Sequence, residues 1–130
     1  MKYLCSLGSN IDPEMNIHHA KQQLRTLSGD CLFSQNIATK PVDIDTNNGF
    51  LNALFIIDTP LSSDELKQQF NQIEEALGRD RSDPERSKKD RTIDIDILGL
   101  LDEHPDVPDY LQSLTTELGL SSWQKPHLLP

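Results

Sequence analysis

The stretch Leu77-Gly-Arg-Asp-Arg-Ser-Asp-Pro-Glu-Arg-Ser-Lys-Lys-Asp-Arg-Thr-Ile-Asp-Ile-Asp-Ile-Leu98 decides which fold the sequence predicts. Residues 79–91 form a polar segment with four arginines and two lysines, and residues 93–97 alternate isoleucine with aspartate. Alternation with a period of two predicts a strand, because successive side chains on a strand point to opposite faces of the sheet. We therefore expect three isoleucines to face the core and two aspartates to lie side by side on the other face: Ile93, Ile95 and Ile97, and Asp94 and Asp96.

The two aspartates are candidate ligands of a metal ion. Carboxylates on one strand face repel each other unless a cation lies between them, and their oxygens suit Mg²⁺. Each arginine of the preceding segment can bind phosphate through two parallel hydrogen bonds. The stretch therefore indicates a metal–polyphosphate site, although an ordinary half-exposed strand after a solvated basic loop has the same pattern. The arginines concerned are Arg79, Arg81, Arg86 and Arg91.

Composition limits the functional class. The chain has 130 residues, which suits one domain over residues 1–130, with its core in residues 1–101 and a divergent tail in residues 102–130. The net charge of −9 argues against a nucleic-acid or anionic-membrane partner. We find no signal-peptide pattern and no apolar run long enough to span a membrane. Cys5 and Cys31 lack metal-ligand spacing, which indicates reduced thiols and a cytoplasmic location.

Three further strands are expected, at residues 2–7, 31–39 and 50–59. The last is nearly continuous in apolar residues, which indicates a central strand. Gly8, which follows the first strand, indicates a turn or a close approach of another group. Asn52 is polar in a buried strand and needs partners, either as a structural residue or as an amide that faces a ligand.

Two helices lie between these strands. Asp12-Pro13 marks the start of the first, and Ser62 with Glu65 forms a capping box that begins the second, which ends near Gly78. Adjacent positions on a helix diverge, so His18-His19 is expected on the surface. The order β-α-β-β-α-β predicts an α+β, ferredoxin-like sandwich: a mostly antiparallel sheet with both helices packed on one face. A short helix over residues 110–118 is possible.

Four motifs occur in a fixed order: Leu7-Gly8-Ser9-Asn10, Phe50-Leu51-Asn52-Ala53, Leu77-Gly78-Arg79-Asp80-Arg81, and Arg91-Thr92-Ile93-Asp94-Ile95-Asp96-Ile97-Leu98. Together they closely resemble the 6-hydroxymethyl-7,8-dihydropterin pyrophosphokinase family of the folate pathway. That family has a ferredoxin-like fold and transfers the terminal diphosphate of ATP to the hydroxymethyl group of the pterin, which releases AMP. The resemblance implies ATP and the pterin as small-molecule substrates and two Mg²⁺ ions as cofactors. We expect a monomer.

The resemblance also implies roles for single residues on the nucleotide side. Asp94 and Asp96 are similar to the carboxylates that hold two Mg²⁺ ions on the ATP phosphates. Arg79 and Arg91 resemble the arginines that neutralise the transferring group, so these four residues are the candidate catalytic set. Arg81 and Arg86 resemble helpers on a mobile loop. The remaining candidates for ATP binding are Glu74, Ile95 and Tyr110.

On the pterin side, Asn52 resembles the amide that hydrogen-bonds the pterin, and Phe50 stands where the family often has a stacking tyrosine. Thr39 and Val42 match the loop that recognises the pterin through its backbone. Gly8 completes the candidate pterin-binding set.

The tail departs from the family pattern. Asp109, Thr115 and Glu117 stand near positions where the family has a histidine and an arginine that touch ATP and a phenylalanine that stacks on the pterin. Acids beside polyphosphate are unfavourable. Two alternatives therefore stay open: a divergent paralogue that keeps a Mg²⁺–nucleotide site without pterin activity, and a non-catalytic ferredoxin-like interaction module.

Overall fold

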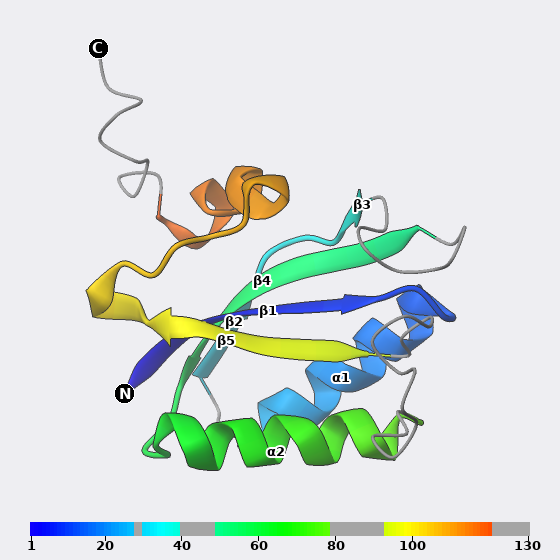
Figure 1. Ribbon diagram of the computed structural model, residues 1–130, viewed down its shortest axis with the longest axis horizontal. Coiled ribbons are helices and arrows are strands. Elements are labelled where there is room, and N and C mark those ends of the chain that lie inside the picture. Colours follow the sequence, from blue (N-terminus) through cyan, green and yellow to red (C-terminus); the bar gives the residue numbers. More distant parts are fainter. Residues whose placement is uncertain (28–29, 40–48, 79–92, 121–130) are drawn as a thin grey trace.

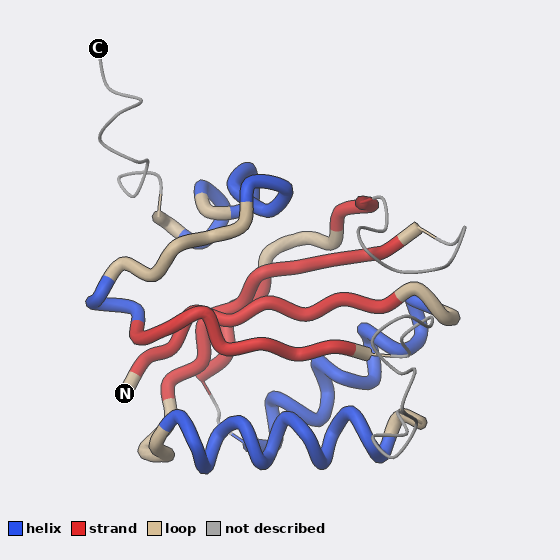
Figure 2. The backbone as a smooth tube through the Cα atoms, in the orientation of Figure 1, coloured by secondary structure: helices blue, strands red, loops and turns tan. Residues whose placement is uncertain are grey.

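The computed structural model describes residues 1–27, 30–39, 49–78 and 93–120 (Figures 1 and 2). These residues form two α-helices, five strands and three short 3₁₀ helices. The elements are β1 (Lys2–Ser9), α1 (Pro13–Leu27), β2 (Asp30–Phe33), β3 (Ile37–Thr39), β4 (Phe50–Asp58), α2 (Ser63–Ala76), β5 (Asp94–Leu100), η1 (Leu101–Glu103), η2 (Asp109–Leu114) and η3 (Thr116–Leu118).

The strands form one sheet in the order β2-β4-β1-β5, with β3 also paired to β4. All pairings among the described strands are antiparallel. Both α-helices cover the same face of the sheet (Figure 1). The predicted ferredoxin-like α+β architecture is therefore confirmed, including the central position of β4.

The strand predicted over residues 31–39 is two strands, β2 and β3, and Ser34 explains the break. The N–H of Ser34 donates to the carbonyl of Leu54 (2.9 Å), and the N–H of Leu54 donates to the hydroxyl of Ser34 (2.9 Å). The serine side chain thus takes the place of a backbone acceptor in the ladder, and the chain leaves the regular strand at this point.

The helix boundaries follow the predicted signals. α1 begins at Pro13, and the two histidines that follow are exposed as expected. At the start of α2, Glu65 donates its N–H to the Ser62 hydroxyl (3.2 Å), and the Ser62 N–H donates to the Glu65 carboxylate (3.0 Å). This is the predicted capping box. The helix ends before Gly78, whose φ of 105° suits a residue without a side chain.

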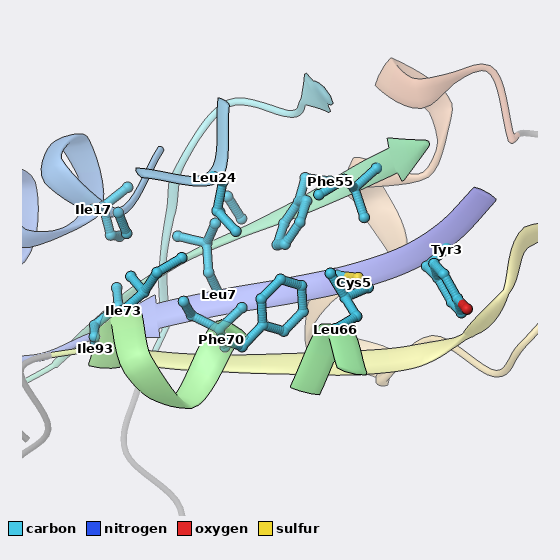
Figure 3. Packing of buried hydrophobic residues seen from close by; sticks show 14 residues of the cluster. Tyr3, Cys5, Leu7, Ile17, Leu24, Phe55, Leu66, Phe70, Ile73 and Ile93 are labelled. Atoms are coloured by element: carbon cyan, nitrogen blue, oxygen red, sulfur yellow. The ribbon is translucent and has the colours of Figure 1, made fainter. Parts of the chain in front are cut away.

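The main core lies between the sheet and the two helices (Figure 3). β1, β4 and β5 supply alternate residues to it, and α1 and α2 supply residues at helical spacing. Ile93 and Ile95 are fully buried there and Ile97 packs against the cluster, as predicted. Cys5 is buried within it, which raises the pKa of its thiol, and both Cys5 and Cys31 are free.

A second apolar layer, which the sequence did not predict, covers part of the opposite face of the sheet. Leu4 and Leu54 point to this side and pack against leucines and a valine of the segment after β5. The short helix predicted over residues 110–118 is two 3₁₀ helices within this segment. In Figure 1 the segment lies over one part of this face, and Ile37 of β3 also packs against the layer. The residues of this layer are Val107, Leu111, Leu114, Leu118 and Leu120.

A bulge redirects the chain from β5 into this layer. Leu4 pairs with Gly99 while the next residue, Cys5, pairs with Ile97, so β5 carries one extra residue. Gly99 has a φ of 154°, and a Cβ on it would come within 2.8 Å of the Pro105 side chain. The absence of a side chain therefore lets the returning segment lie close to the strand.

If residues 101–120 are an integral layer of the fold, truncation of a leucine inside it should cost as much as truncation in the main core. Leu114 is 1% exposed, so we expect Leu114→Ala to lower the free energy of unfolding by about 2–5 kcal/mol. Leu32→Ala is the control, because Leu32 is 53% exposed and should change stability by about 0.5 kcal/mol or less. Urea denaturation measures both. Equal, small effects would show that the layer does not contribute to stability.

Candidate functional site

Three predicted site residues lie in one row across the sheet. Gly8 on β1 is opposite Asn52 on β4 and also opposite Asp94 on β5. Their neighbours in the strands, Ala53 and Ile95, belong to the core on the helix side. Because side chains alternate along a strand, Asn52 and Asp94 face away from the helices, on the same face of the sheet as the second layer.

Gly8 makes room for the Asn52 amide, which lies over β1 at this point. A Cβ built on Gly8 would overlap the side-chain oxygen of Asn52. Of the two meanings that the sequence left open, a turn or a close approach, the structure shows the close approach, since Gly8 lies inside β1. The backbones at Asn52 and Asp94 are two strand spacings apart, about 10 Å, and the Asn52 side chain leans over Gly8, which lies between them.

Asn52 and Thr39 form the amide side of the row. Asn52 is 8% exposed, and its Nδ2 donates a hydrogen bond to the Thr39 hydroxyl. This bond holds the Asn52 side chain beside β3. Phe50, two residues before Asn52 and opposite Thr39, is half-buried on the same face of β4. The structure therefore brings together four of the residues predicted for pterin binding: Gly8, Thr39, Phe50 and Asn52.

Asp94 and Asp96 form the carboxylate side. Asp96 is opposite Ser6, one row along from Gly8, and its side chain is 52% exposed. Partial burial and the negative charge of Asp94 raise the pKa of Asp96, and Lys67 acts in the opposite direction. The pair thus lies on one strand face as predicted, and its mutual repulsion would be relieved by a cation.

This donor set fits a magnesium ion that is shared with phosphate. Among the described residues, no group of three or more His, Cys, Asp or Glu side chains could hold a metal on its own. Mg²⁺ is commonly held by one or two carboxylates together with substrate phosphates and water. The two aspartates supply the protein part of such a site.

The edge of β5 is held by two side chains of α2, the helix that runs beside it (Figure 1). The backbone N–H of Ile95 donates to the carboxylate of Glu74 (2.7 Å), which is fully buried, and the ammonium of Lys67 donates to the carbonyl of Ile95 (3.1 Å). Ile95 lies between the two aspartates, so these bonds hold the strand segment that carries both carboxylates. They also pair backbone groups at an open sheet edge.

Lys67 is a site residue that the sequence reasoning missed. Its ammonium lies 3.6 Å from the carboxylate of Asp96. No motif contains it, and its position follows only from the docking of α2 against β5. The helical pattern does place it directly after Leu66, a buried residue, which is the only signal the sequence offers.

Several predicted residues lie outside the described residues: Val42, Arg79, Arg81, Arg86 and Arg91. Tyr110 is described, is 54% exposed, and belongs to η2, which packs over Leu54 rather than over the row itself.

The altered tail residues make contacts within the protein. Thr115 is buried and donates its hydroxyl proton to the carbonyl of Gln112 (2.7 Å). Glu117 accepts a hydrogen bond from the backbone N–H of Gln35 (2.9 Å), between β2 and β3. Thr115 therefore stabilises the turn that ends η2, whereas Glu117 joins the second layer to the segment between β2 and β3.

The close fit at Gly8 predicts a specific defect. Gly8→Ala should displace the Asn52 amide and lower the free energy of unfolding by about 1–3 kcal/mol, because the new methyl group overlaps the amide oxygen. Ser6→Ala, on the same face of the same strand, is the matched control and should change little. Chemical denaturation and the NMR signals of the Asn52 side-chain NH₂ measure the two effects. Unchanged Asn52 side-chain signals in Gly8→Ala would contradict the close contact between Gly8 and the Asn52 amide.

The raised pKa of Asp96 predicts how metal-free stability depends on pH. At a pH above the raised pKa, the fold holds a carboxylate whose charged form it disfavours, so Asp96→Asn should raise the melting temperature. As the pH falls through that pKa toward the ordinary value of aspartate, the wild type takes up the proton preferentially when folded and the advantage disappears. Thermal unfolding with a chelator measures this, with Asp102→Asn as an exposed control. If Asp96→Asn is less stable than the wild type at neutral pH, the fold does not disfavour the charged form of Asp96 and the prediction is wrong.

Comparison with known proteins identifies the family. A family model described as 7,8-dihydro-6-hydroxymethylpterin-pyrophosphokinase matches residues 4–118, so the likeness extends beyond residue 101 and includes the 3₁₀ helices of the second layer. No curated protein matched the chain in a sequence search. No helix among the described residues is both long and apolar enough to cross a membrane. The chain therefore belongs to the 7,8-dihydro-6-hydroxymethylpterin-pyrophosphokinase family, the ATP-dependent pterin pyrophosphokinases of folate biosynthesis.

Proposed function

We propose that this protein transfers the terminal diphosphate of ATP to the hydroxymethyl group of 6-hydroxymethyl-7,8-dihydropterin and releases AMP. One observation carries the proposal: an amide and a pair of carboxylates lie on either side of Gly8, on the face of the sheet that points away from the helices. The amide suits the polar edge of a pterin ring, and the carboxylates suit a metal–phosphate. Both substrates could therefore meet across a single residue without a side chain.

The amide side would bind the pterin. Asn52 would offer both a donor and an acceptor to the ring edge, and the bond to Thr39 holds its side chain in place. Phe50 offers a half-buried aromatic face against which the ring can stack. Backbone groups of Thr39 and Val42 would complete the recognition. In this arrangement Gly8 makes room for the amide that would meet the ring.

The carboxylate side would bind ATP with two Mg²⁺ ions. When bound, Mg²⁺ neutralises the charge of the phosphates and of the transferring group. Asp94 and Asp96 would hold these ions, and α2 keeps the two carboxylates in place through the backbone of Ile95. Glu74, Ile95 and Tyr110 belong to the nucleotide side of the proposal. Four arginines would contact the phosphates: Arg79 and Arg91 at the transferring group, and Arg81 and Arg86 as helpers.

The proposed reaction is a displacement at the β-phosphorus. The hydroxymethyl oxygen of the pterin loses its proton to water and forms a bond to the β-phosphorus of ATP. The bond between that phosphorus and the oxygen bridging to the α-phosphorus breaks, so that AMP leaves with the bridging oxygen. Phosphoryl transfer of this kind depends on positioning and charge neutralisation rather than on a covalent enzyme intermediate. We propose that the enzyme works as a cytoplasmic monomer with no partner other than its small-molecule substrates.

One assay tests the proposal directly. The protein is incubated with MgATP, with and without 6-hydroxymethyl-7,8-dihydropterin, and the nucleotide products are separated by chromatography. We expect AMP only when the pterin is present, and a loss of roughly 10²-fold or more in rate for Asp96→Asn. Asp102→Asn, which removes an exposed carboxylate from η1, should keep full activity.

Other products would overturn the assignment in distinct ways. ADP would indicate a different phosphoryl transfer. Binding of MgATP without any product would favour a divergent paralogue, an alternative that the replaced tail residues support because Thr115 and Glu117 serve internal contacts. Failure to bind either substrate would favour a non-catalytic interaction module.

A further inference from the structure

Lys67 occupies a place that the proposed reaction does not use. Its ammonium donates to the carbonyl of Ile95 (3.1 Å) and lies 3.6 Å from Oδ1 of Asp96. Leu66, the preceding residue of α2, is fully buried in the core and fixes this part of the helix against the sheet. The ammonium is therefore held at the carboxylate pair by the backbone as well as by charge.

This position gives the carboxylate pair a permanent positive neighbour. Two carboxylates carry a charge of −2, and the ammonium reduces the local charge to −1. A divalent cation that binds the pair comes close to a cation that the Ile95 carbonyl holds in place. Repulsion between the two cations opposes metal binding in the absence of other anions.

A nucleotide reverses this balance. The triphosphate adds several negative charges beside the pair, so that a metal ion and an ammonium are both attracted there. Lys67 has a side chain that is 43% exposed, and its ammonium has donors left after the bond to Ile95. It can therefore remain next to Asp96 while the metal and the phosphates bind.

We propose that Lys67 is a positioning residue that acts as a resident counter-cation: it weakens binding of divalent metal to Asp94 and Asp96 alone and so makes metal binding depend on the nucleotide. This inference rests on the proposed function, because that function supplies the metal and the nucleotide. It predicts that the nucleotide-free protein binds metal weakly and that removal of the Lys67 charge increases its affinity for the metal.

The experiment is a titration of the nucleotide-free protein with Mn²⁺, a paramagnetic substitute for Mg²⁺, followed by EPR of the unbound ion. Lys67→Gln keeps a donor for the Ile95 carbonyl but removes the charge, and it should bind Mn²⁺ roughly tenfold more tightly than the wild type. Lys67→Arg keeps the charge and should stay weak. With a non-hydrolysable ATP analogue present, the difference between the wild type and Lys67→Gln should shrink.

Two controls make the result specific. Lys21→Gln changes the net charge equally but removes a lysine of α1 that lies over the Phe33 ring, and it should leave Mn²⁺ affinity unchanged. Lys67→Met, which keeps an apolar stem of similar length, is a second neutral variant in case Lys67→Gln does not fold, as judged by circular dichroism. Tight binding by either neutral variant should be lost when Asp96→Asn is added.

Equal or weaker Mn²⁺ binding by the folded neutral variants would overturn the inference and leave Lys67 as a purely structural cover of the strand edge. No Mn²⁺ binding by any variant would also overturn it. The AMP assay separates this result from the proposed function, since it reads product and not metal affinity. If the wild type makes no AMP but Lys67→Gln binds Mn²⁺ more tightly than the wild type, the proposed reaction is refuted and the role of Lys67 as a counter-cation is supported.

Discussion

The pairing of β1 on both of its sides is the constraint on which the rest of the structure depends. β1 is hydrogen-bonded to β4 and to β5, and this double pairing sets Gly8 opposite Asn52 and Asp94 at once. A slip of one residue in either pairing would turn the corresponding side chains to the helix face. The burial of alternate residues against α1 and α2 makes such a slip costly, because it would expose the core of that strand. The packing of one face therefore fixes the arrangement of polar groups on the other.

The two faces of the sheet have different tasks. The helix face is filled by a continuous apolar cluster (Figure 3), whereas the other face is divided between an apolar half and a polar half. Residues 101–120 cover the apolar half, and the bulge in β5 with Gly99 lets the chain turn back over Leu4 and Leu54. The tail that departs from the family pattern thus has a clear structural role, and the family match includes it up to residue 118.

Much of the fold could be predicted because its signals are local. The alternation in residues 93–97 gives the two faces of β5, and Ser62 with Glu65 gives the start of α2. The division of the strand at Ser34 could not be predicted, since it depends on a hydrogen bond to Leu54 on another strand. The second layer was missed because 3₁₀ helices are short and leave no helical period in the sequence.

The site was predicted in part, and the reason is similar. Asp94, Asp96 and Asn52 stand out as polar residues in apolar strands, so their importance is visible in the sequence. Their position on either side of Gly8 follows from the register of β1 with β4 and β5, which no single motif contains. Lys67 is a surface-type residue on an amphipathic helix, and only the packing of α2 beside β5 brings it to Asp96. A residue whose role depends on the packing of two elements against each other cannot be identified from the sequence alone.

The same double pairing of β1 determines the order in which the site can be assembled during synthesis. Among the described strands β1 is the first and β5 the last, so Gly8 and Asn52 are both synthesised before Asp94. The amide half can thus exist in a nascent chain, but the carboxylate half requires contact between residues that are far apart in the sequence, which is the slowest kind to form. Until then the outer edge of β1 has no partner strand and is exposed to pairing with other chains. Completion of the carboxylate half and protection of that edge are therefore a single late event in folding.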